Sequence, residues 1–506
     1  MFKSKRIFCL YLISVFVFIL SVQSAFTQEL TPAKKAAIAW IDGSKATYDE
    51  IAKYLWDNPE LSLVEFKAAA KLQDYLAKNG FKIEKGVAGM PTAFVATWGS
   101  GKPIIGFLAE FDALPGISQK AGIVVRGAVI SGAPGHGCGH NIFGTTSVTA
   151  AIATKVAMEK HGIKGTIKLF GCPAEETLVG KIFMARDGVF DGTDIMISWH
   201  PWDWNGVFYM SWLAMSSIKF QFKGLPAHAA LAPHAGRSAL DGVELMNIAM
   251  NFMREHVIQE ARIHYTIPKG GEVPNIVPPE AESWYFIRSP RRTQVDEIWK
   301  WMQDVAKGAA LMTQTTMSFK ILCATWEQLP NKVLSKLGDS NIRAIGTPPF
   351  TPEDQKFGEE IIKSLGKEVK GESFDTTIRS PDLSKTFPNV TVLAASTDEG
   401  TVSWMFPTLS FRAATHAKGS PLHTWQVVSQ TGSAPTMKAG LTASKWMAAT
   451  ALDCLTKPEI ISEAWKEHNG YLAETKYYHP IPADLKVPTF KDLYGIEPEA
   501  VPGMKK

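Results

Sequence analysis

Short apolar runs that resemble buried strands alternate with helical stretches through the first half of the chain. The strand-type runs cover residues 92–98, 103–108, 166–171 and 194–199, and helical spacing covers residues 145–161 and a stretch near 180–187. Strands that alternate with helices are typical of an α/β unit with a mostly parallel sheet. In such a sheet, ligands bind beyond the carboxyl ends of the strands. The alternation therefore predicts an α/β fold class and the sheet edge at which functional side chains should gather.

The pattern changes near Met215. A strand is predicted at 216–223, followed by a helix at 237–256, strands at 262–267 and 282–288, a helix at 295–311 and a strand at 317–325. This order is that of a ferredoxin-like α+β unit. We therefore expect a satellite domain at 213–329, inserted into a main domain formed by 26–212 and 330–506. The tail after residue 457 has no clear pattern.

The first 25 residues have the features of a secretory signal peptide. Lys3, Lys5 and Arg6 precede an apolar run at 7–20, and small residues, of which Ala25 is the last, follow it. This order is typical of a cleaved leader, and the run is too short to span a bilayer comfortably. We expect export to the periplasm or medium, with no stable membrane insertion after cleavage. An uncleaved membrane anchor is the alternative.

Charge and cysteine content exclude several classes of function. The chain has 53 Lys+Arg and 49 Asp+Glu, and removal of three basic leader residues leaves 50 − 49 = +1. A nearly neutral chain without a basic block gives no support for nucleic-acid binding. Of the five cysteines, Cys138, Cys172, Cys323 and Cys454 would survive cleavage. Four cysteines do not form a disulfide scaffold in so long a chain, and a single structural bridge is the alternative to free thiols.

A glycine-rich segment, Gly135-His136-Gly137-Cys138-Gly139-His140-Asn141, precedes a predicted helix. Cys138 and His140 offer a thiolate and an imidazole two residues apart, which suits one metal ion or two adjacent ions. Nitrogen and sulfur ligands favour zinc and similar ions. The alternative is a glycine-rich turn with a buried cysteine. His136 is not assigned as a ligand, because a position behind the ligands or in a turn suits it equally.

Carboxylates follow two of the predicted strands. Asp112 follows the run at 103–108, where it would orient a ligand, bind metal or simply form a turn. Glu175 and Glu176 follow the run at 166–171. Adjacent carboxylates diverge on extended backbone, so one can bind metal while the other acts as a general base towards water. A solvated acidic turn is the alternative.

Two further histidines are candidate ligands. His200 stands before a proline at the end of the run at 194–199, where it would be a metal ligand or a buried core histidine. His423 lies in Gly419-Ser-Pro-Leu-His423-Thr-Trp425. The sequence alone does not bring His423 near the other residues, and His416 is an equal candidate on physical grounds.

Together these stretches resemble the metal-dependent amidohydrolases and aminoacylases of the carboxypeptidase-like metallopeptidase clan, and within them the B-type aminobenzoyl-glutamate utilisation proteins. The resemblance covers nearly all of the mature chain. It rests on the segments GHGCGHNIFG, GCPAEE, SWHP, GEVPNIVP and GSPLHTWQ. Position 110 is Glu where the family often has Asp, and Thr177 to Val179 stand where relatives are often rich in glycine. The predicted leader also differs from that cytoplasmic type.

The resemblance implies a function and a set of site residues. Two divalent ions, zinc or manganese, would have as ligands Cys138, His140, Glu176, His200 and His423, with Cys138 shared between them. The ions would activate a water molecule, and Glu175 would be the catalytic base. Asp112 would lie close to the site. The implied reaction is hydrolysis of the amide bond of an N-acyl or N-aroyl amino acid such as aminobenzoyl-glutamate.

The resemblance also assigns roles to the satellite domain. It would act as a dimerisation or lid domain, and a homodimer is expected. His228 would polarise the scissile carbonyl, often across a dimer, and Asn275 and Arg288 would bind the substrate carboxylate. Three alternatives remain: a dipeptidase or aminopeptidase that uses the same site, a non-catalytic metal-containing binding protein, and a paired complex with a similar subunit instead of a homodimer.

Overall fold

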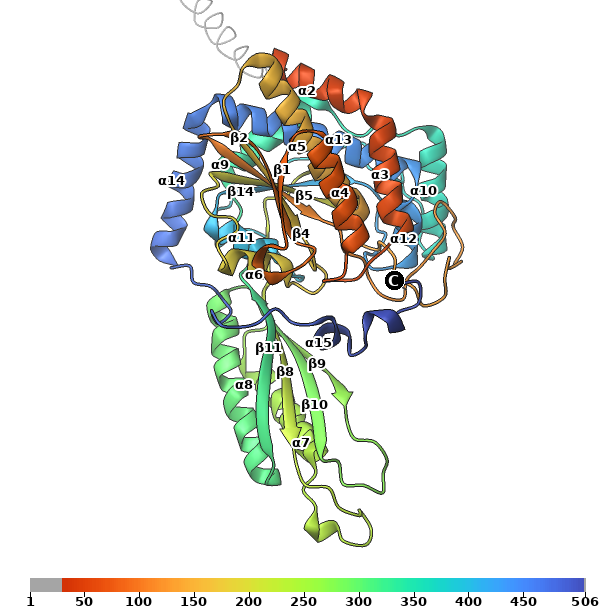
Figure 1. The fold of residues 1–506 in the computed structure, drawn as a ribbon, viewed down its shortest axis with the longest axis vertical. Helices are drawn as coiled ribbons and strands as arrows, with labels where there is room; N and C mark the ends of the chain where they lie inside the picture. The colour runs from red at the N-terminus through yellow and green to blue at the C-terminus, as the bar shows by residue number, and fades with distance from the viewer. Residues whose placement is uncertain (1–29, 505–506) are drawn as a thin grey trace, which may run out of the picture.

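The structure of the protein is a computed structural model in which residues 30–504 are described (Figure 1). The predicted signal peptide lies outside these residues. Among the described helices, none combines the length and the apolar character that a bilayer crossing needs.

The main unit is built on an eight-stranded sheet. Its order is β1-β2-β4-β3-β5-β14-β6-β12. The strands are β1 (Lys82–Lys85), β2 (Phe94–Ser100), β3 (Ile104–Glu110), β4 (Gly165–Cys172), β5 (Ile195–Trp202), β6 (Asn205–Val207), β12 (Ile378–Arg379) and β14 (Thr408–Ala414). The four central strands, β4, β3, β5 and β14, are parallel to one another. Three of the predicted strands, β3, β4 and β5, lie in this parallel centre, whereas predicted β2 is antiparallel to β4 and central β14 is not among the predicted elements.

Helices cover both faces of the sheet (Figure 1). One apolar core lies between the sheet and α2 (Pro32–Gly43), α3 (Lys45–Asp57), α4 (Phe66–Lys78), α5 (His140–His161), α9 (Lys332–Ile345) and α13 (Ala434–Thr456). A second core packs α6 (Gly180–Arg186) and α11 (Glu399–Met405) against the other face. The remaining helices are α10 (Pro352–Ser364), α12 (Trp425–Thr431), α14 (Pro458–Glu474) and α15 (Phe490–Tyr494).

Helices α5 and α2 are two of those that differ from the prediction. Helix α5 begins at His140, five residues before the predicted start, because Gly139 precedes it in a left-handed conformation (φ 84°). Helix α2 is not among the predicted elements. It carries Lys34, whose Nζ atom lies 2.5 Å from Oδ2 of Asp453 in α13, and both side chains are buried. A buried ion pair on the inner face of a helix weakens the apolar periodicity that indicates a helix in a sequence.

The satellite unit has the predicted strand-helix-strand-strand-helix-strand order. Its elements are β8 (Ala214–Lys223), α7 (Ala239–Met253), β9 (Arg262–Lys269), β10 (Glu280–Ser289), α8 (Arg292–Thr313) and β11 (Thr316–Thr325). The strands form an antiparallel sheet in the order β11-β8-β10-β9, and the two helices pack on it around a separate apolar core. The limits 213 and 329 that we give to this domain stay a prediction.

The C-terminal tail crosses the junction between the two units (Figure 1). Trp326 Nε1 donates to the carbonyl of Tyr478 at 2.9 Å, and Nζ of Lys320 on β11 lies 2.6 Å from Oδ1 of Asp492 in α15. Two short strands near the junction, β7 (Ser211–Trp212) and β13 (Val392–Leu393), form a separate parallel pair. The tail therefore ties the satellite unit to the main unit.

Candidate metal centre

The candidate ligands converge at the carboxyl edge of the central sheet. His200 lies near the end of β5, Glu175 and Glu176 follow β4, and Asp112 follows β3. His140 is the first residue of α5. His423 comes from a distant loop, and its backbone N–H donates to the carbonyl of Gly137 at 2.9 Å. This hydrogen bond explains how the structure brings together residues that the sequence separates widely.

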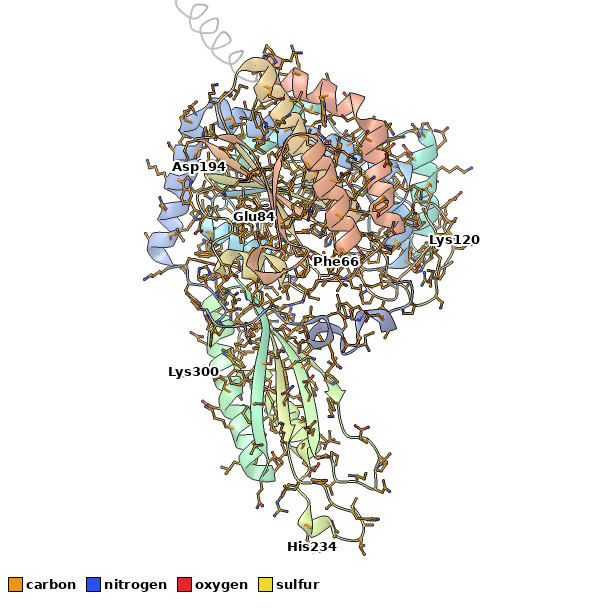
Figure 2. All side chains as sticks on the ribbon, viewed as in Figure 1. Phe66, Glu84, Lys120, Asp194, His234 and Lys300 are labelled. Carbon is orange, nitrogen blue, oxygen red and sulfur yellow. The ribbon has the colours of Figure 1, made fainter. Side chains whose placement is uncertain are left out.

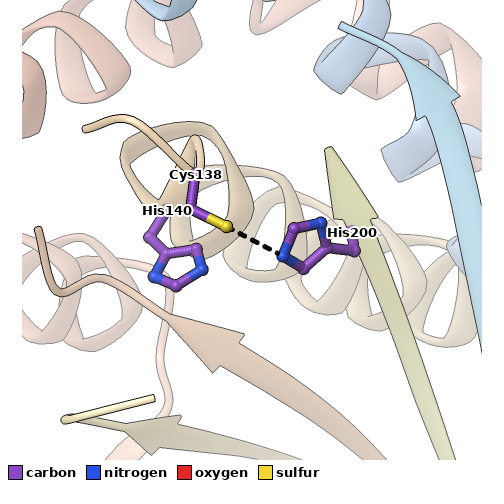
Figure 3. Close-up of side chains that lie close together, drawn as sticks. All are labelled: Cys138, His140 and His200. Carbon is purple, nitrogen blue, oxygen red and sulfur yellow. Dashed lines mark hydrogen bonds between the residues drawn. The ribbon is translucent and has the colours of Figure 1, made fainter. Parts of the chain in front are cut away.

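The ligand atoms form two groups that share one residue. Cys138, His140 and His200 offer atoms that all lie within 4.8 Å of one another, and so do Cys138, Glu176 and His423. Figure 3 shows the first group, in which Cys138 Sγ lies 3.4 Å from His200 Nε2. In the second group, His423 Nε2 lies 3.3 Å from Glu176 Oε2. The thiol of Cys138 is thus common to both potential metal-binding groups.

Hydrogen bonds orient two of the imidazoles. Nδ1 of His140 lies 2.9 Å from Oδ1 of Asp112, and Nδ1 of His200 lies 2.7 Å from the carbonyl oxygen of Pro201. Because oxygen acceptors hold the Nδ1 protons, Nε2 of each ring keeps its lone pair for a metal ion. Asp112 also accepts from Ser62 Oγ at 3.0 Å and from the backbone N–H of Glu176 at 2.9 Å. This carboxylate therefore supports two of the candidate ligands.

Three buried carboxylate and imidazole atoms around the candidate ligands have no hydrogen-bond partner among the described residues. These are Oε2 of Glu110, Nε2 of His140 and Oε1 of Glu176. Oε2 of Glu110 lies 3.3 Å from Nε2 of His140 without hydrogen-bond geometry. Buried polar atoms are nearly always paired, so these three atoms favour a cation as their partner. Burial raises the pKa of Glu176 to about 8 and raises the pKa of the Cys138 thiol above its usual range. Divalent cations would favour the ionised forms of both groups. The donor set fits zinc-like ions.

Glu175 and Glu176 diverge, as the sequence predicts. Glu175 belongs to a different cluster, with Glu110 and His140, and its Oε2 lies 3.8 Å from His140 Nε2. Burial raises the pKa of Glu175 well above its ordinary value, and the nearby Glu110 carboxylate adds to this shift. Ala174 (φ 57°), directly before the Glu pair, and Leu178 (φ 56°), two residues after it, have left-handed backbone. Such conformations are rare outside glycine, and residues 175–178 form a tight turn.

A buried ion cluster that the sequence patterns do not predict lies beneath the site. Nζ of Lys181, in α6, lies 2.7 Å from Oε1 of Glu110 and 2.5 Å from Oδ1 of Asp398. The three side chains are almost fully buried. Lys181 therefore compensates two of the carboxylates near Glu175. Glu110 stands out in the sequence because relatives often have Asp there, whereas Lys181 is followed by a run of apolar residues in α6 and does not stand out.

A cavity of about 390 Å³ opens beside the metal-binding groups. Apolar side chains from both units form part of its wall, among them Trp202, Trp212, Met215 and Phe286. Two guanidinium groups also line it, Arg288 from β10 and Arg412 from β14. Burial lowers the pKa of Arg412 to about 10, which still leaves it charged at neutral pH. Arg288 is among the residues that the resemblance indicates, whereas Arg412 lies within an apolar strand and gives no such signal.

The structure does not bring His228 or Asn275 to this cavity within one chain. The backbone N–H of Ala229 donates to the carbonyl of Asn275 at 3.0 Å, so the two residues belong to one surface region of the satellite unit. His228 is exposed, and His234, six residues later, lies at the far end of that unit (Figure 2). For either residue to act in catalysis, it would have to reach the cavity of a second chain.

The other histidines and cysteines lie outside the two groups. His136 is buried, with Nε2 3.1 Å from the carbonyl of Leu55, and His416 Nδ1 lies 3.2 Å from Thr415 Oγ1. The structure thus separates His416 from the cluster that contains His423. The four cysteines among the described residues are buried, and none of them forms a disulfide.

Comparison with known proteins identifies the family. A family model described as the peptidase dimerisation domain of the M20 group matches residues 214–312. The chain is 39% identical to the B-type subunit of p-aminobenzoyl-glutamate hydrolase from Escherichia coli (strain K12) over 464 residues, which cover 88% of this chain and 96% of that protein. It is 28% identical to the Xaa-Arg dipeptidase of Mus musculus over 466 residues, with 88% and 94% coverage.

A solved structure shows the same fold. A Bacillus subtilis protein described as a dinuclear metal-binding peptidase of the M20 family superposes with a TM-score of 0.52 and 16% identity, over 82% of this chain and 99% of that one. The expected α/β fold with a dimerisation domain is therefore confirmed, and so is the resemblance seen in the sequence. The chain belongs to the M20 family of hydrolases.

Proposed function

We propose that the protein is a dinuclear-metal amidohydrolase that cleaves the amide bond of N-acyl or N-aroyl amino acids of the aminobenzoyl-glutamate kind. The observation that carries the proposal is the position of Cys138 in both three-residue groups, with Glu175 beside them but in neither. This layout provides ligands for two adjacent ions and leaves one carboxylate free to handle protons. The 39% identity to a protein named for aminobenzoyl-glutamate hydrolysis supports the choice of substrate.

Each residue has a defined task in this proposal. Cys138, His140, Glu176, His200 and His423 would hold zinc or manganese, which would supply an activated water molecule and polarise the amide carbonyl. Glu175 would accept a proton from that water and pass it to the leaving amine. Its raised pKa suits this exchange, because a carboxylate with a raised pKa is the stronger base. Arg288 would bind a carboxylate of the substrate.

His228 would complete the site of a second copy of the chain. The match to a dimerisation domain supports this arrangement, and so does the absence of His228 from the cavity wall of its own chain. We expect His228→Ala and Glu175→Gln homodimers to be inactive. Mixed dimers of the two variants would contain one intact site and regain activity. If verified mixed dimers stay inactive, another residue must polarise the scissile carbonyl in place of His228.

The central test separates binding from chemistry. Glu175→Gln should abolish hydrolysis of aminobenzoyl-glutamate, while elemental analysis shows unchanged metal content. Retained turnover would reject Glu175 as the base. The wild-type protein should be assayed with aminobenzoyl-glutamate and with free dipeptides side by side, because a preference for dipeptides would favour a dipeptidase. Bound metal without hydrolysis of any substrate would favour a binding protein.

We also propose that the protein is exported, on the strength of residues 1–25. Cell fractionation combined with N-terminal sequencing of the mature protein tests this. A cytoplasmic protein that retains Met1 would contradict it.

A further inference from the structure

Two guanidinium groups line the cavity without an ion-pair partner among the described residues. Nη1 of Arg412 donates to Ser410 Oγ at 2.7 Å and to the carbonyl of Phe411 at 2.8 Å, but neither acceptor carries a charge. The Nε atoms of Arg288 and Arg412 also have no hydrogen-bond partner among the described residues. Arg412 is only 3% exposed. A buried cation without a directly paired counter-ion is costly, so a negatively charged group of a ligand in the cavity would stabilise Arg412.

The carboxylate of Glu399 attracts the Arg412 guanidinium, but the two side chains form no ion pair. Glu399 also lines the cavity, but its two carboxylate oxygens accept hydrogen bonds elsewhere. Oε2 accepts from Ser198 Oγ at 2.7 Å, and Oε1 accepts from Gln328 Nε2 at 2.9 Å. The hydroxyl of Ser396, on the same cavity wall, is also buried and unpaired among the described residues. Unpaired donors therefore lie beside a Glu399 carboxylate whose two oxygens are both in use. The unpaired carboxylate oxygens of Glu110 and Glu176, on the same cavity, belong to the potential metal-binding clusters.

Arg412 is held rigidly next to the metal-binding groups. On β14 it is the register partner of His200 on β5. Its guanidinium carbon lies 4.1 Å from the ring centre of Phe208 and 5.7 Å from that of Trp202. Aromatic rings hold the guanidinium plane by cation–π contact. A fixed planar guanidinium is suited to bidentate binding of a carboxylate.

We propose that Arg412 is a specificity-determining residue that binds one carboxylate of the substrate, while Arg288 binds another. The preferred substrates would then carry two carboxylates, as acylated acidic amino acids do. This inference rests on the proposed function. It names the part of the site that selects the amino-acid half of the substrate.

Three substrates that differ in one charge test the assignment. They are aminobenzoyl-glutamate, aminobenzoyl-glutamine, which lacks the side-chain carboxylate, and 4-(aminobenzamido)butanoate, which lacks the α-carboxylate. We expect wild-type kcat/KM to be highest for the dicarboxylate. Arg412→Met should lower kcat/KM for the dicarboxylate by roughly 100-fold, the size of a charge-assisted contact, and leave one monocarboxylate within a few-fold of its wild-type value. An equal loss on all three substrates would overturn the proposal.

A matched variant and a conservative variant control for folding. Arg379 also stacks on a tryptophan, with its guanidinium carbon 4.5 Å from the ring centre of Trp204, but it is exposed and outside the cavity. Arg379→Met should keep the wild-type preference among the substrates. If Arg412→Met does not fold, Arg412→Lys decides: it keeps the charge but loses the planar fork, so the preference for the dicarboxylate should fall. An unchanged preference would refute the assignment.

A binding measurement separates this inference from the proposed function. Calorimetry with the metal-loaded protein would compare glutarate with butyrate. Wild-type protein should bind glutarate more tightly, and Arg412→Met should remove the difference. If wild-type protein hydrolyses none of the three substrates but shows this pattern, the proposed function fails and the anion site stands. If glutarate binding is the same in Arg412→Met, the inference fails whatever the activity.

Discussion

Sγ of Cys138 and Nε2 of His200 lie 3.4 Å apart, although the two residues are 62 positions apart in the chain. A thiol and an imidazole lone pair at this distance flank a space into which one metal ion fits after small side-chain shifts. The same thiol also reaches the group of Glu176 and His423. Both potential metal-binding groups therefore include the sulfur atom of Cys138.

Replacement of Cys138 should empty both metal-binding groups. In Cys138→Ala each group loses a ligand, so affinity should fall by more than the roughly 10- to 100-fold that loss of a residue supporting a ligand costs. Elemental analysis after dialysis against a weak chelator measures this. Cys454→Ala, a change at another buried free cysteine in α13, serves as the control and should keep its metal. Full metal content in Cys138→Ala would show that the sulfur is not a shared ligand.

Asp112 should tune metal affinity without binding metal itself. Asp112→Asn keeps the shape of the side chain but weakens its contact with His140 Nδ1. We expect metal affinity to fall by roughly 10- to 100-fold, with full occupancy recovered at high metal concentration. Competition with a fluorescent chelator gives the dissociation constants. Ser62→Ala, which removes only a hydroxyl donor to the same carboxylate, should have a much smaller effect.

The parts of the fold that sequence patterns predict are those with simple periodicity. The parallel strands β3, β4 and β5 and the order of the satellite elements follow from apolar spacing, whereas the central strand β14 is not predicted. Helix α2 escapes prediction because buried Lys34 interrupts its apolar face. Of the site, Cys138 and His140 stand close together in the sequence, whereas the choice of His423 over His416 depends on a backbone hydrogen bond to Gly137. Isolated cations within apolar segments, such as Lys181 in α6, give no periodic signal.

Lys181 should be essential for stability because it compensates two buried carboxylates. Lys181→Met would leave Glu110 and Asp398 without their counter-ion, and loss of one partner of a buried ion pair costs about 3–5 kcal/mol. Thermal and urea unfolding measure this loss. The double variant Lys181→Met/Glu110→Gln removes one of the stranded charges, so it should be more stable than the single variant. A single variant as stable as wild type would show that solvent or a bound ion replaces the ammonium.

Acid sensitivity should come partly from His468, far from the metal-binding groups. His468 is buried in α14, and its Nε2 lies 3.2 Å from the carbonyl of Trp404. Burial lowers the pKa of His468 from 6.5 to about 4. Because the unfolded chain takes up this proton at a higher pH than the folded chain, the contribution of His468 to stability is present above pH 6.5. It is lost progressively as the pH falls from 6.5 to about 4.

Between pH 7.5 and pH 5, this loss amounts to about 2 kcal/mol, from 1.36 kcal/mol per pKa unit over the part of the interval below 6.5. His468→Gln keeps a side-chain donor for Trp404 but does not titrate, so its free energy of unfolding should fall by that much less than wild type over the same interval. Urea unfolding at both pH values measures the difference. His161→Gln, an exposed change at the end of α5, should follow the wild type. Equal acid sensitivity of His468→Gln and wild type would mean that the folded chain accommodates the protonated ring.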